Sequence, residues 1–374
     1  MSGARRPVLV VKLGSSSVTT PDGRVDTAAI GSICREIALI RAGSLRVVVV
    51  SSGAIAAGWS ALGEGRKRSK DLAVLQAVSA VGQPLLVQAW IDGLARHGLV
   101  AGQVLLAPLD FVHRQQYLHA RQTLDHLLDL GVVPIVNEND AVADDEIRFG
   151  DNDRLAALVS NLVGADRLAL LTDTPGLFTA DPKVVAEASL IEEVVEIDHQ
   201  LEQWAGGPGS PVGSGGMASK LAAAKIATWS GVETVIAEAG RPGVLASVVA
   251  GEPGAGTVFR ARPRTLSARK LWIAFARASA GTVVVDDGAR KALVEEGRSL
   301  LAAGVRSVTG KFAPDDAVEV LDASGSVVAK GLVRYPASRA SEWIGRRSEQ
   351  LPDDLARELI HRDDMVVLGS SGSV

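Results

Sequence analysis

The stretch VLVVKLGSSS at residues 8–17 joins four apolar residues to a lysine, a leucine, a glycine and three serines. A short apolar run that ends in a Gly/Ser turn is typical of a buried strand leading into an anion-binding turn. Glycine lets backbone N–H groups approach an anion closely, and Lys12 adds a full charge. A second lysine-bearing turn, GSGGMASK at 213–220, precedes an Ala-rich helical stretch. Two such turns predict that a phosphate chain is held from both ends, as phosphoryl transfer requires.

Further apolar runs alternate with longer helical patterns. The runs are VLVV (8–11), VVVV (47–50), VVPIV (132–136), LALL (168–171) and TVIA (234–237). Helices are predicted near 26–42, 70–97, 114–130, 152–163 and 217–230. Strands that are apolar on both faces and alternate with helices predict an α/β fold, with a largely parallel sheet covered on both sides. Such sheets bind ligands at the carboxyl ends of their strands.

The composition limits the class of protein. The 374 residues exceed one typical domain, so two domains are predicted, and a hydrophobic content of 47% allows a large core. A formal net charge of -4 argues against a nucleic-acid partner. The single cysteine, Cys34, favours a reducing, cytoplasmic compartment. We expect no stretch to approach the roughly 18 apolar residues of a membrane span, and hence no membrane partner.

The character of the sequence changes after residue 260. Residues 260–270, RARPRTLSARK, contain five basic residues and no apolar periodicity, which predicts a basic linker. Further on, the turn DASGS lies between VEVL and VVAKG and predicts a hairpin. The predicted organisation is a catalytic domain over 1–260, a linker over 261–274, a small β-rich, barrel-like domain over 275–355 and a loose tail over 356–374.

Polar turns follow the other predicted strands. Ser51-Ser52-Gly53-Ala54 follows VVVV, and small residues there can cap a helix or bind a carboxylate, two interpretations that stay equally open. Asn137-Glu138-Asn139-Asp140 follows VVPIV, and Gly150-Asp151-Asn152-Asp153 opens a helix after a predicted hairpin over 141–149. Together these turns predict a substrate wall, in which acidic groups bind an ammonium and amides bind a carboxylate. Asp153 is predicted to lie between Lys12 and Lys220 and to fix both.

Two other nucleotide motifs fit less well. GVRSVTGKF at 304–312 resembles a Walker A loop, but its spacing is one residue too long and Phe312 stands where Ser or Thr must bind the metal. Residues 213–218 match a dinucleotide fingerprint, but a Gly/Pro-rich loop precedes them instead of a strand. No HExxH, CxxC or clustered histidines occur, so no residue is assigned to a metal. Any Mg²⁺ is expected to arrive with the phosphates of ATP.

In this order, the motifs VKLGSSS, SSGAIAAG, VNENDAV, FGDNDRLAA, LLTDTPGLFTADPK and GSGGMASKL resemble those of the amino acid kinase family. The resemblance covers residues 7–260, and the rest of the chain resembles a PUA domain. It implies an α/β/α sandwich of the amino acid kinase type, followed by a PUA-like β domain.

The resemblance also implies roles for individual residues. Lys12 and Lys220 match the lysines that stabilise the transferring phosphoryl group and the leaving ADP, and Asp153 resembles the aspartate that organises them. The positions that match glutamate-binding residues are Ser52, Asp140 and Asn152. Those that match ATP-binding segments are Lys12, Thr172, Asp173, Ser214, Gly215, Gly216, Met217, Ala218, Ser219 and Lys220.

The activity implied by the resemblance is ATP-dependent phosphorylation of the γ-carboxylate of L-glutamate to L-glutamyl 5-phosphate, the first step of proline synthesis. Feedback inhibition by proline, a homodimer or homotetramer, and hand-off of the product to glutamate-5-semialdehyde dehydrogenase are implied in the same way. The alternatives are a kinase for another carboxylate, carbamate or nucleotide, and an RNA-binding role. Residues 271–374 carry 13 Lys/Arg against 15 Asp/Glu, which argues against RNA.

Overall fold

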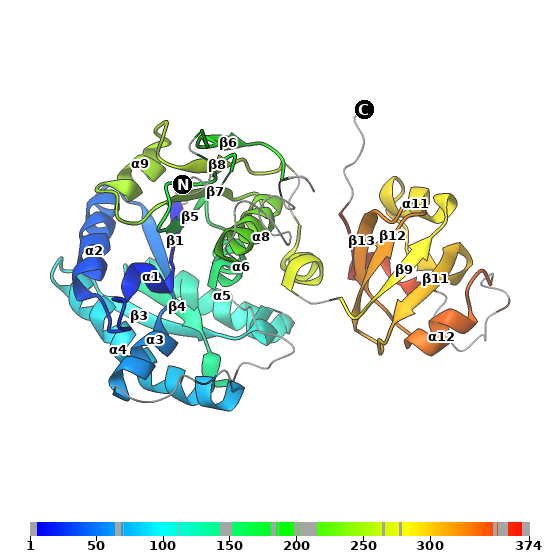
Figure 1. Ribbon diagram of the computed structural model, residues 1–374, viewed down its shortest axis with the longest axis horizontal. Coiled ribbons are helices and arrows are strands. Elements are labelled where there is room, and N and C mark those ends of the chain that lie inside the picture. The colour runs from blue at the N-terminus through cyan, green and yellow to red at the C-terminus, as the bar shows by residue number, and fades with distance from the viewer. Residues whose placement is uncertain are drawn as a thin grey trace. The chain divides into compact units, whose positions relative to one another are not determined.

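The structure is a computed structural model (Figure 1). It describes residues 6–63, 69, 71–111, 113–142, 152–180, 185, 187–197, 201, 215–263, 266–276, 279–346, 350 and 358–368. The chain divides into two compact units, residues 1–265 and 266–374. Each unit is described by itself below.

The first unit is built on an eight-stranded sheet with the order β3-β4-β2-β1-β5-β7-β8-β6. Every neighbouring pair is parallel except β7 and β8, so the prediction of a largely parallel sheet is confirmed. The strands are β1 (Val8–Leu13), β2 (Arg46–Ser51), β3 (Ala101–Leu106), β4 (Val133–Glu138), β5 (Arg167–Thr172), β6 (Glu193–Val194), β7 (Glu233–Glu238) and β8 (Thr257–Phe259).

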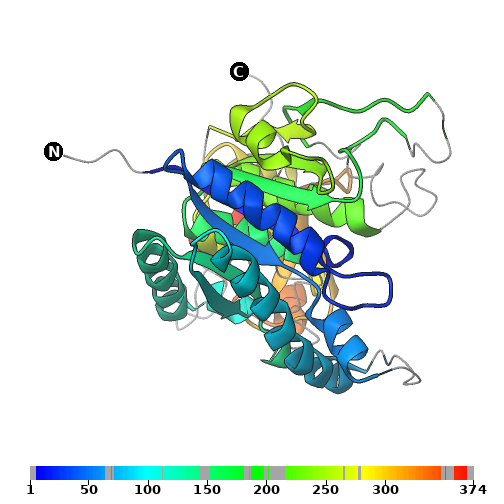
Figure 2. The same cartoon turned by 90° about the vertical axis from the view of Figure 1, so that its left-hand side faces the viewer.

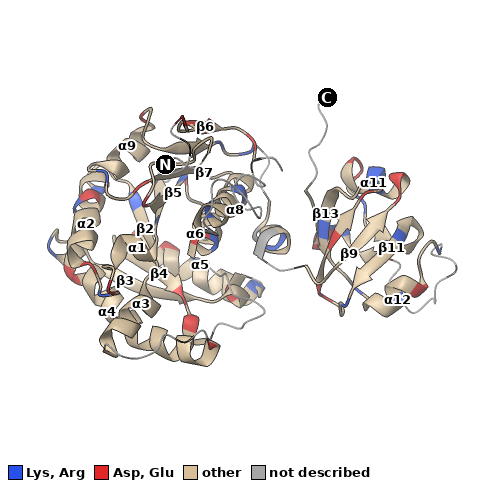
Figure 3. Ribbon diagram, viewed as in Figure 1, with Lys and Arg blue, Asp and Glu red and all other residues tan. Residues whose placement is uncertain are grey.

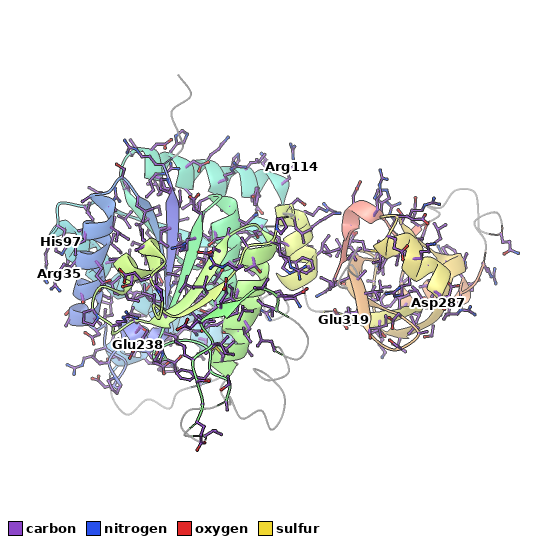
Figure 4. The ribbon with its side chains drawn as sticks, turned by 90° about the horizontal axis from the view of Figure 1, so that it is seen from above. Arg35, His97, Arg114, Glu238, Asp287 and Glu319 are labelled. Atoms are coloured by element: carbon purple, nitrogen blue, oxygen red, sulfur yellow. The ribbon has the colours of Figure 1, made fainter. Side chains whose placement is uncertain are left out.

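Helices cover both faces of this sheet. One layer contains α2 and α4 with α9 and α3, and the other contains α6 and α8 with α5 (Figures 1 and 2). Arg35 on α2 and His97 just after α4 lie on the same side of the unit (Figure 4). The helices are α1 (Ser15–Val18), α2 (Thr27–Arg41), α3 (Ala54–Ala61), α4 (Leu72–Ala95), η1 (Pro108–Phe111), α5 (Arg114–Asp129), η2 (Asp140–Val142), α6 (Asn152–Leu162), α8 (Gly215–Trp229) and α9 (Val244–Ala250).

The core lies between the sheet and its helices. Strands β1 and β2 are buried along almost their whole length, because both of their faces are covered. In this unit, charged residues occur on the helices and loops and near the strand ends rather than in the middle of the strands (Figure 3). Cys34 of α2 is fully buried in this core, and burial raises the pKa of its thiol to about 12. This environment is that of a structural thiol.

Helices α3 and α4 cross at glycines. A Cβ atom added to Gly82 would lie 1.8 Å from the carbonyl oxygen of Ala54, and one added to Gly58 would lie 1.9 Å from that of Val78. We therefore expect Gly82→Ala to lower the free energy of unfolding by about 1–3 kcal/mol or more, although alanine favours helix. Gly31→Ala on α2 is the matched control, because nothing lies within 4 Å of its added Cβ. Denaturant unfolding measures both variants, and equal stabilities would contradict the close crossing.

Helix α4 also corrects one expectation. With 24 residues and a mean hydropathy of 1.4 in its most apolar window, it is long and apolar enough to cross a membrane by length and composition. From the sequence, no segment of this length and hydropathy was expected. In this fold α4 packs against α2 and α3, and Leu86, Trp90 and Leu94 are buried in the core. A core helix of a globular unit has the same composition, because its buried face must be apolar.

The second unit contains a five-stranded sheet, β11-β9-β12-β13-β15, and a two-stranded sheet, β10-β14. The predicted hairpin is present, since β12 and β13 are antiparallel. The strands are β9 (Gly281–Val285), β10 (Leu300–Leu301), β11 (Val305–Gly310), β12 (Ala317–Leu321), β13 (Val327–Leu332), β14 (Glu358–Ile360) and β15 (Met365–Val367). The helical segments are α10 (Ala268–Leu271), η4 (Trp272–Ala276), α11 (Asp287–Val294), η5 (Ala302–Gly304), α12 (Ala337–Glu342) and η7 (Arg362–Asp364).

The structure differs from two expectations about this region. The predicted loose tail, 356–374, contains β14 and β15, which pair with β10 and β13, because Leu359, Ile360 and Met365 are buried in the core of the unit. The predicted linker, 261–274, contains α10 and part of η4, in which Leu271 and Ile273 are buried. The linker was predicted because this stretch is rich in basic residues, and the few apolar residues such as Leu271 and Ile273 gave no recognisable pattern.

Candidate active site

The carboxyl ends of four neighbouring strands meet at one edge of the first unit's sheet. The register places Leu13 of β1 beside Ser51 of β2 and Leu171 of β5, and Val50 beside Val136 of β4. A pocket of about 400 Å³ opens at this edge. The predicted residues that line it are Lys12, Ser52, Asp140, Asn152, Asp153, Gly216, Ser219 and Lys220. Segments separated by up to two hundred residues therefore meet in one place.

Asp153 lies between the two lysines. One carboxylate oxygen is paired with Lys12 Nζ, and the other is 3.3 Å from Lys220 Nζ. Ser219 Oγ donates to the second oxygen at 2.7 Å. Lys12, Asp153 and Lys220 are 4%, 1% and 8% exposed, so the carboxylate serves two ammonium groups away from bulk water. Such charge-assisted contacts hold side chains firmly.

Three elements supply this triad. Lys12 lies near the end of β1, Asp153 in the first turn of α6, and Lys220 one turn into α8. Lys220 Nζ also donates to the carbonyl oxygen of Gly216, 3.3 Å away, so its side chain folds back along its own helix. Helix N-termini carry a partial positive charge, and the pocket therefore combines two lysines with the first turns of helices that include α6 and α8.

The pKa of Asp153 reflects this environment. Burial raises it, but the positive charges of Lys12 and Lys220 and the hydrogen bonds from Lys12 and Ser219 together lower it by more, and the net pKa lies below the usual value of 3.8. The carboxylate is therefore ionised at neutral pH, and with two lysines the cluster keeps a net positive charge of one. That charge faces the pocket and is suited to binding phosphate.

An amide cluster forms another part of the pocket lining, which we call the acidic wall. Asn152 Nδ2 is 3.0 Å from the carbonyl oxygen of Ser51, 3.1 Å from Ser52 Oγ and 2.7 Å from Asn137 Oδ1. Asp140 Oδ2 accepts a 2.7 Å hydrogen bond from Ser79 Oγ of α4. Glu138 is buried and also lines the pocket. This wall is acidic, in contrast to the lysine side.

The turn between β2 and α3 closes the pocket from a third side. Gly53 has a φ of 111°, in the left-handed region that favours glycine, and precedes α3 without a side-chain cap. Ala54, Ile55 and Ala56 line the pocket at the start of that helix. Gly53 is the N-cap of α3, so the two interpretations of residues 51–54, a helix cap and a turn that binds a carboxylate, both fit this geometry.

Other predicted residues lie elsewhere. Thr172 and Asp173 lie at the end of β5, where Thr172 Oγ1 donates to Asp173 Oδ1 at 3.0 Å, and they do not line this pocket. Met217 and Ala218 are on α8, also away from the lining, and Gly215 begins that helix. Ser214, residues 150–151 and the predicted hairpin from 143 onward lie outside the described residues. No three or more His, Cys, Asp or Glu side chains in the described part of the chain are grouped so as to hold a metal.

Two residues of α4 that hydrogen-bond to the acidic wall were not predicted from the sequence. Ser79 and Gln83 are buried and touch Asp140 and Asn137. Their spacing in the sequence could have indicated this role, because two polar residues four positions apart share one face of a largely apolar helix.

Two family models match this chain. The model of the amino acid kinase family matches residues 7–238, and that of the PUA domain matches residues 281–354. The chain belongs to the amino acid kinase family, and it is a kinase that carries a PUA domain.

Individual proteins that resemble this chain include two glutamate 5-kinases. The chain is 47% identical over 372 residues to glutamate 5-kinase of Nocardia farcinica, covering 98% of this chain and 100% of the relative. It is 46% identical over 363 residues to glutamate 5-kinase of Mycobacterium tuberculosis, covering 97% and 95%. Among solved structures, isopentenyl phosphate kinase of T. acidophilum matches 68% of this chain and 100% of its own, with 19% identity and a TM-score of 0.49.

Proposed function

We propose that this kinase transfers the γ-phosphoryl group of ATP to the γ-carboxylate of L-glutamate and so forms L-glutamyl 5-phosphate. The observation that carries the proposal is the pocket that is lined both by Lys12 and Lys220, held by Asp153, and by an acidic, amide-rich wall. The names of relatives about 46% identical over nearly the whole chain support glutamate as the acceptor.

The proposed reaction is an in-line displacement. A γ-carboxylate oxygen attacks the γ-phosphorus, an acyl phosphate bond forms, and the bond to the β–γ bridging oxygen breaks as ADP leaves with the electron pair. A carboxylate is ionised at neutral pH, so no general base is needed. In this proposal Lys12 and Lys220 bind the transferring phosphoryl group and the leaving ADP, and the nucleotide enters as its Mg²⁺ complex.

The difficulty of this reaction is electrostatic, because an anion must approach a polyanion. Two buried lysines that share one carboxylate leave one positive charge to offset the repulsion, in a site sheltered from water where charges act strongly. The ammonium of the acceptor would meet the acidic wall of Asp140 and Glu138.

The direct test is ADP release with different acceptors. Purified protein with ATP and Mg²⁺ is expected to release ADP with L-glutamate, and hydroxylamine is expected to trap the acyl phosphate as the hydroxamate. L-aspartate, carbamate and nucleoside monophosphates at equal concentration serve as rival acceptors. Faster turnover with any of them would contradict the assignment to glutamate.

Asp140→Ala tests the acidic wall. We expect the KM for glutamate to rise about tenfold or more, with smaller changes in kcat and in the KM for ATP, because the variant loses a carboxylate that binds the ammonium of glutamate and leaves both lysines in place. Steady-state kinetics with each substrate varied in turn measure this. An unchanged KM for glutamate would remove Asp140 from the binding site.

The proposal extends to the cellular role. We propose a cytoplasmic homo-oligomer that supplies glutamyl phosphate for proline synthesis and is inhibited by proline, which shares the α-carboxylate and α-nitrogen of glutamate. The similarity of the chain to glutamate 5-kinase of Nocardia farcinica supports this cellular role. Inhibition by proline that is competitive with glutamate would support a shared pocket, and the absence of inhibition would contradict this part of the proposal.

A further inference from the structure

Helix α4 places two polar side chains behind the acidic wall. Ser79 and Gln83 are 3% and 8% exposed, on a helix whose other buried residues are mainly apolar or glycine. A buried polar side chain is unfavourable unless it is hydrogen-bonded. Both are bonded to the wall: Ser79 Oγ donates to Asp140 Oδ2, and Gln83 Oε1 accepts from Asn137 Nδ2 at 2.6 Å.

Backbone groups set the direction of the amide chain that starts at Gln83. The N–H of Glu138 can only donate, and it donates to Asn137 Oδ1 at 2.9 Å. The Nδ2 of Asn137 therefore points the other way, towards Gln83 Oε1. Without that acceptor, Nδ2 would be buried with no partner in this orientation, which is unfavourable.

The same reasoning applies to Asn152. The carbonyl of Ser51 can only accept, and Asn152 Nδ2 donates to it and to Asn137 Oδ1. Both hydrogens of Nδ2 are thus directed into the protein. The Asn152 Oδ1 atom has no hydrogen bond to any residue within the described part of the chain, and Asn152 lines the pocket. The Oδ1 atom of Asn152 is therefore available to accept a hydrogen bond from a ligand in the pocket.

We propose that Ser79 and Gln83 are positioning residues of the acceptor pocket. Ser79 holds the Asp140 carboxylate, and Gln83, through Asn137, keeps the carbonyl end of Asn152 facing the ligand. This part of the pocket thereby presents the hydrogen-bond-accepting oxygens of Asp140 and Asn152 and selects a substrate with an ammonium group. The inference rests on the proposed function, since it assumes that glutamate occupies this pocket.

The test compares glutamate with glutarate, the same dicarboxylate without the ammonium. In Gln83→Met, of similar length but without an acceptor, we expect the KM for glutamate to rise about tenfold while kcat and the KM for ATP change little. The ratio of the glutarate inhibition constant to the glutamate KM is expected to fall about tenfold as well. Gln88→Met makes the same change on the exposed face of α4, where Gln88 bonds only Asp92 among the described residues, and is expected to leave both values unchanged.

Ser79→Ala tests the other arm, and it keeps the proposal testable if Gln83→Met fails to fold. It is expected to raise the KM for glutamate, and Ser79→Thr, which keeps the hydroxyl, is expected to restore it. Ser160→Ala is the matched control, because this equally buried hydroxyl bonds the carbonyl of Ala156 in its own helix.

Folded variants with wild-type glutamate KM and wild-type selectivity would overturn the proposal, and so would a fall in kcat alone. Wild-type protein that releases no ADP with glutamate would instead overturn the proposed function, and this inference with it. The two failures are thus distinguished by the wild-type assay.

Discussion

Lys220→Ala is expected to lower kcat by about 10²–10³ while the protein still folds. Lys220 is one of the two ammonium groups that meet at Asp153, and its removal takes away a preorganised positive charge where negative charge must be offset. The fold survives because Asp153 keeps Lys12 as its partner, so no buried carboxylate is left unpaired. ADP-release kinetics and thermal unfolding measure the two properties separately.

Two variants sharpen this test. Lys220→Arg keeps the charge but changes its geometry, so we expect it to recover only part of the lost rate. Lys225→Ala removes a lysine further along α8 that does not line the pocket, and it is expected to keep the wild-type rate. A Lys220→Ala variant that retains more than about a third of wild-type kcat would refute the proposed role of Lys220.

Asp153→Asn is expected to affect both activity and stability. The substitution leaves two buried lysines without the carboxylate between them, and breaking a buried ion pair in this way costs about 3–5 kcal/mol. The rate is expected to fall by about 10² or more, because neither lysine is then held in place. Asp166→Asn is the control: its carboxylate accepts from the N–H of Val8 at the opposite end of β1, and an amide oxygen can accept that bond too.

The stability difference between wild type and Asp153→Asn should depend on pH. The pKa of Asp153 is lower in the folded protein than its usual value of 3.8. Its contribution is therefore complete above that value and is lost as the pH falls through the lower folded pKa. Denaturant unfolding from pH 7 down to pH 3 is expected to show a constant difference down to about pH 5, which shrinks below about pH 4. A difference that persists unchanged at pH 3 would contradict the ion-pair account.

Much of the fold could be predicted from local patterns. The runs at 8–11, 47–50, 132–136, 168–171 and 234–237 all became strands of the first sheet, because parallel strands covered on both faces must be apolar throughout. Strand β3 was not predicted, since AGQVLL at the edge of the sheet is only partly buried and contains a glycine and a glutamine. Strands β14 and β15 were also missed, because each is only three residues long.

The sequence by itself determined the alternation of strands and helices, the two lysine-bearing segments around residues 12 and 220 and the polar residues that follow the strands, because each depends on neighbouring residues. Only the tertiary structure decided that one carboxylate, Asp153, is shared by Lys12 and Lys220. It also decided that Ser79 and Gln83 hold the acceptor wall. These contacts join residues far apart in the chain, and their distances depend on how strands align in the sheet and how glycines let α3 and α4 approach.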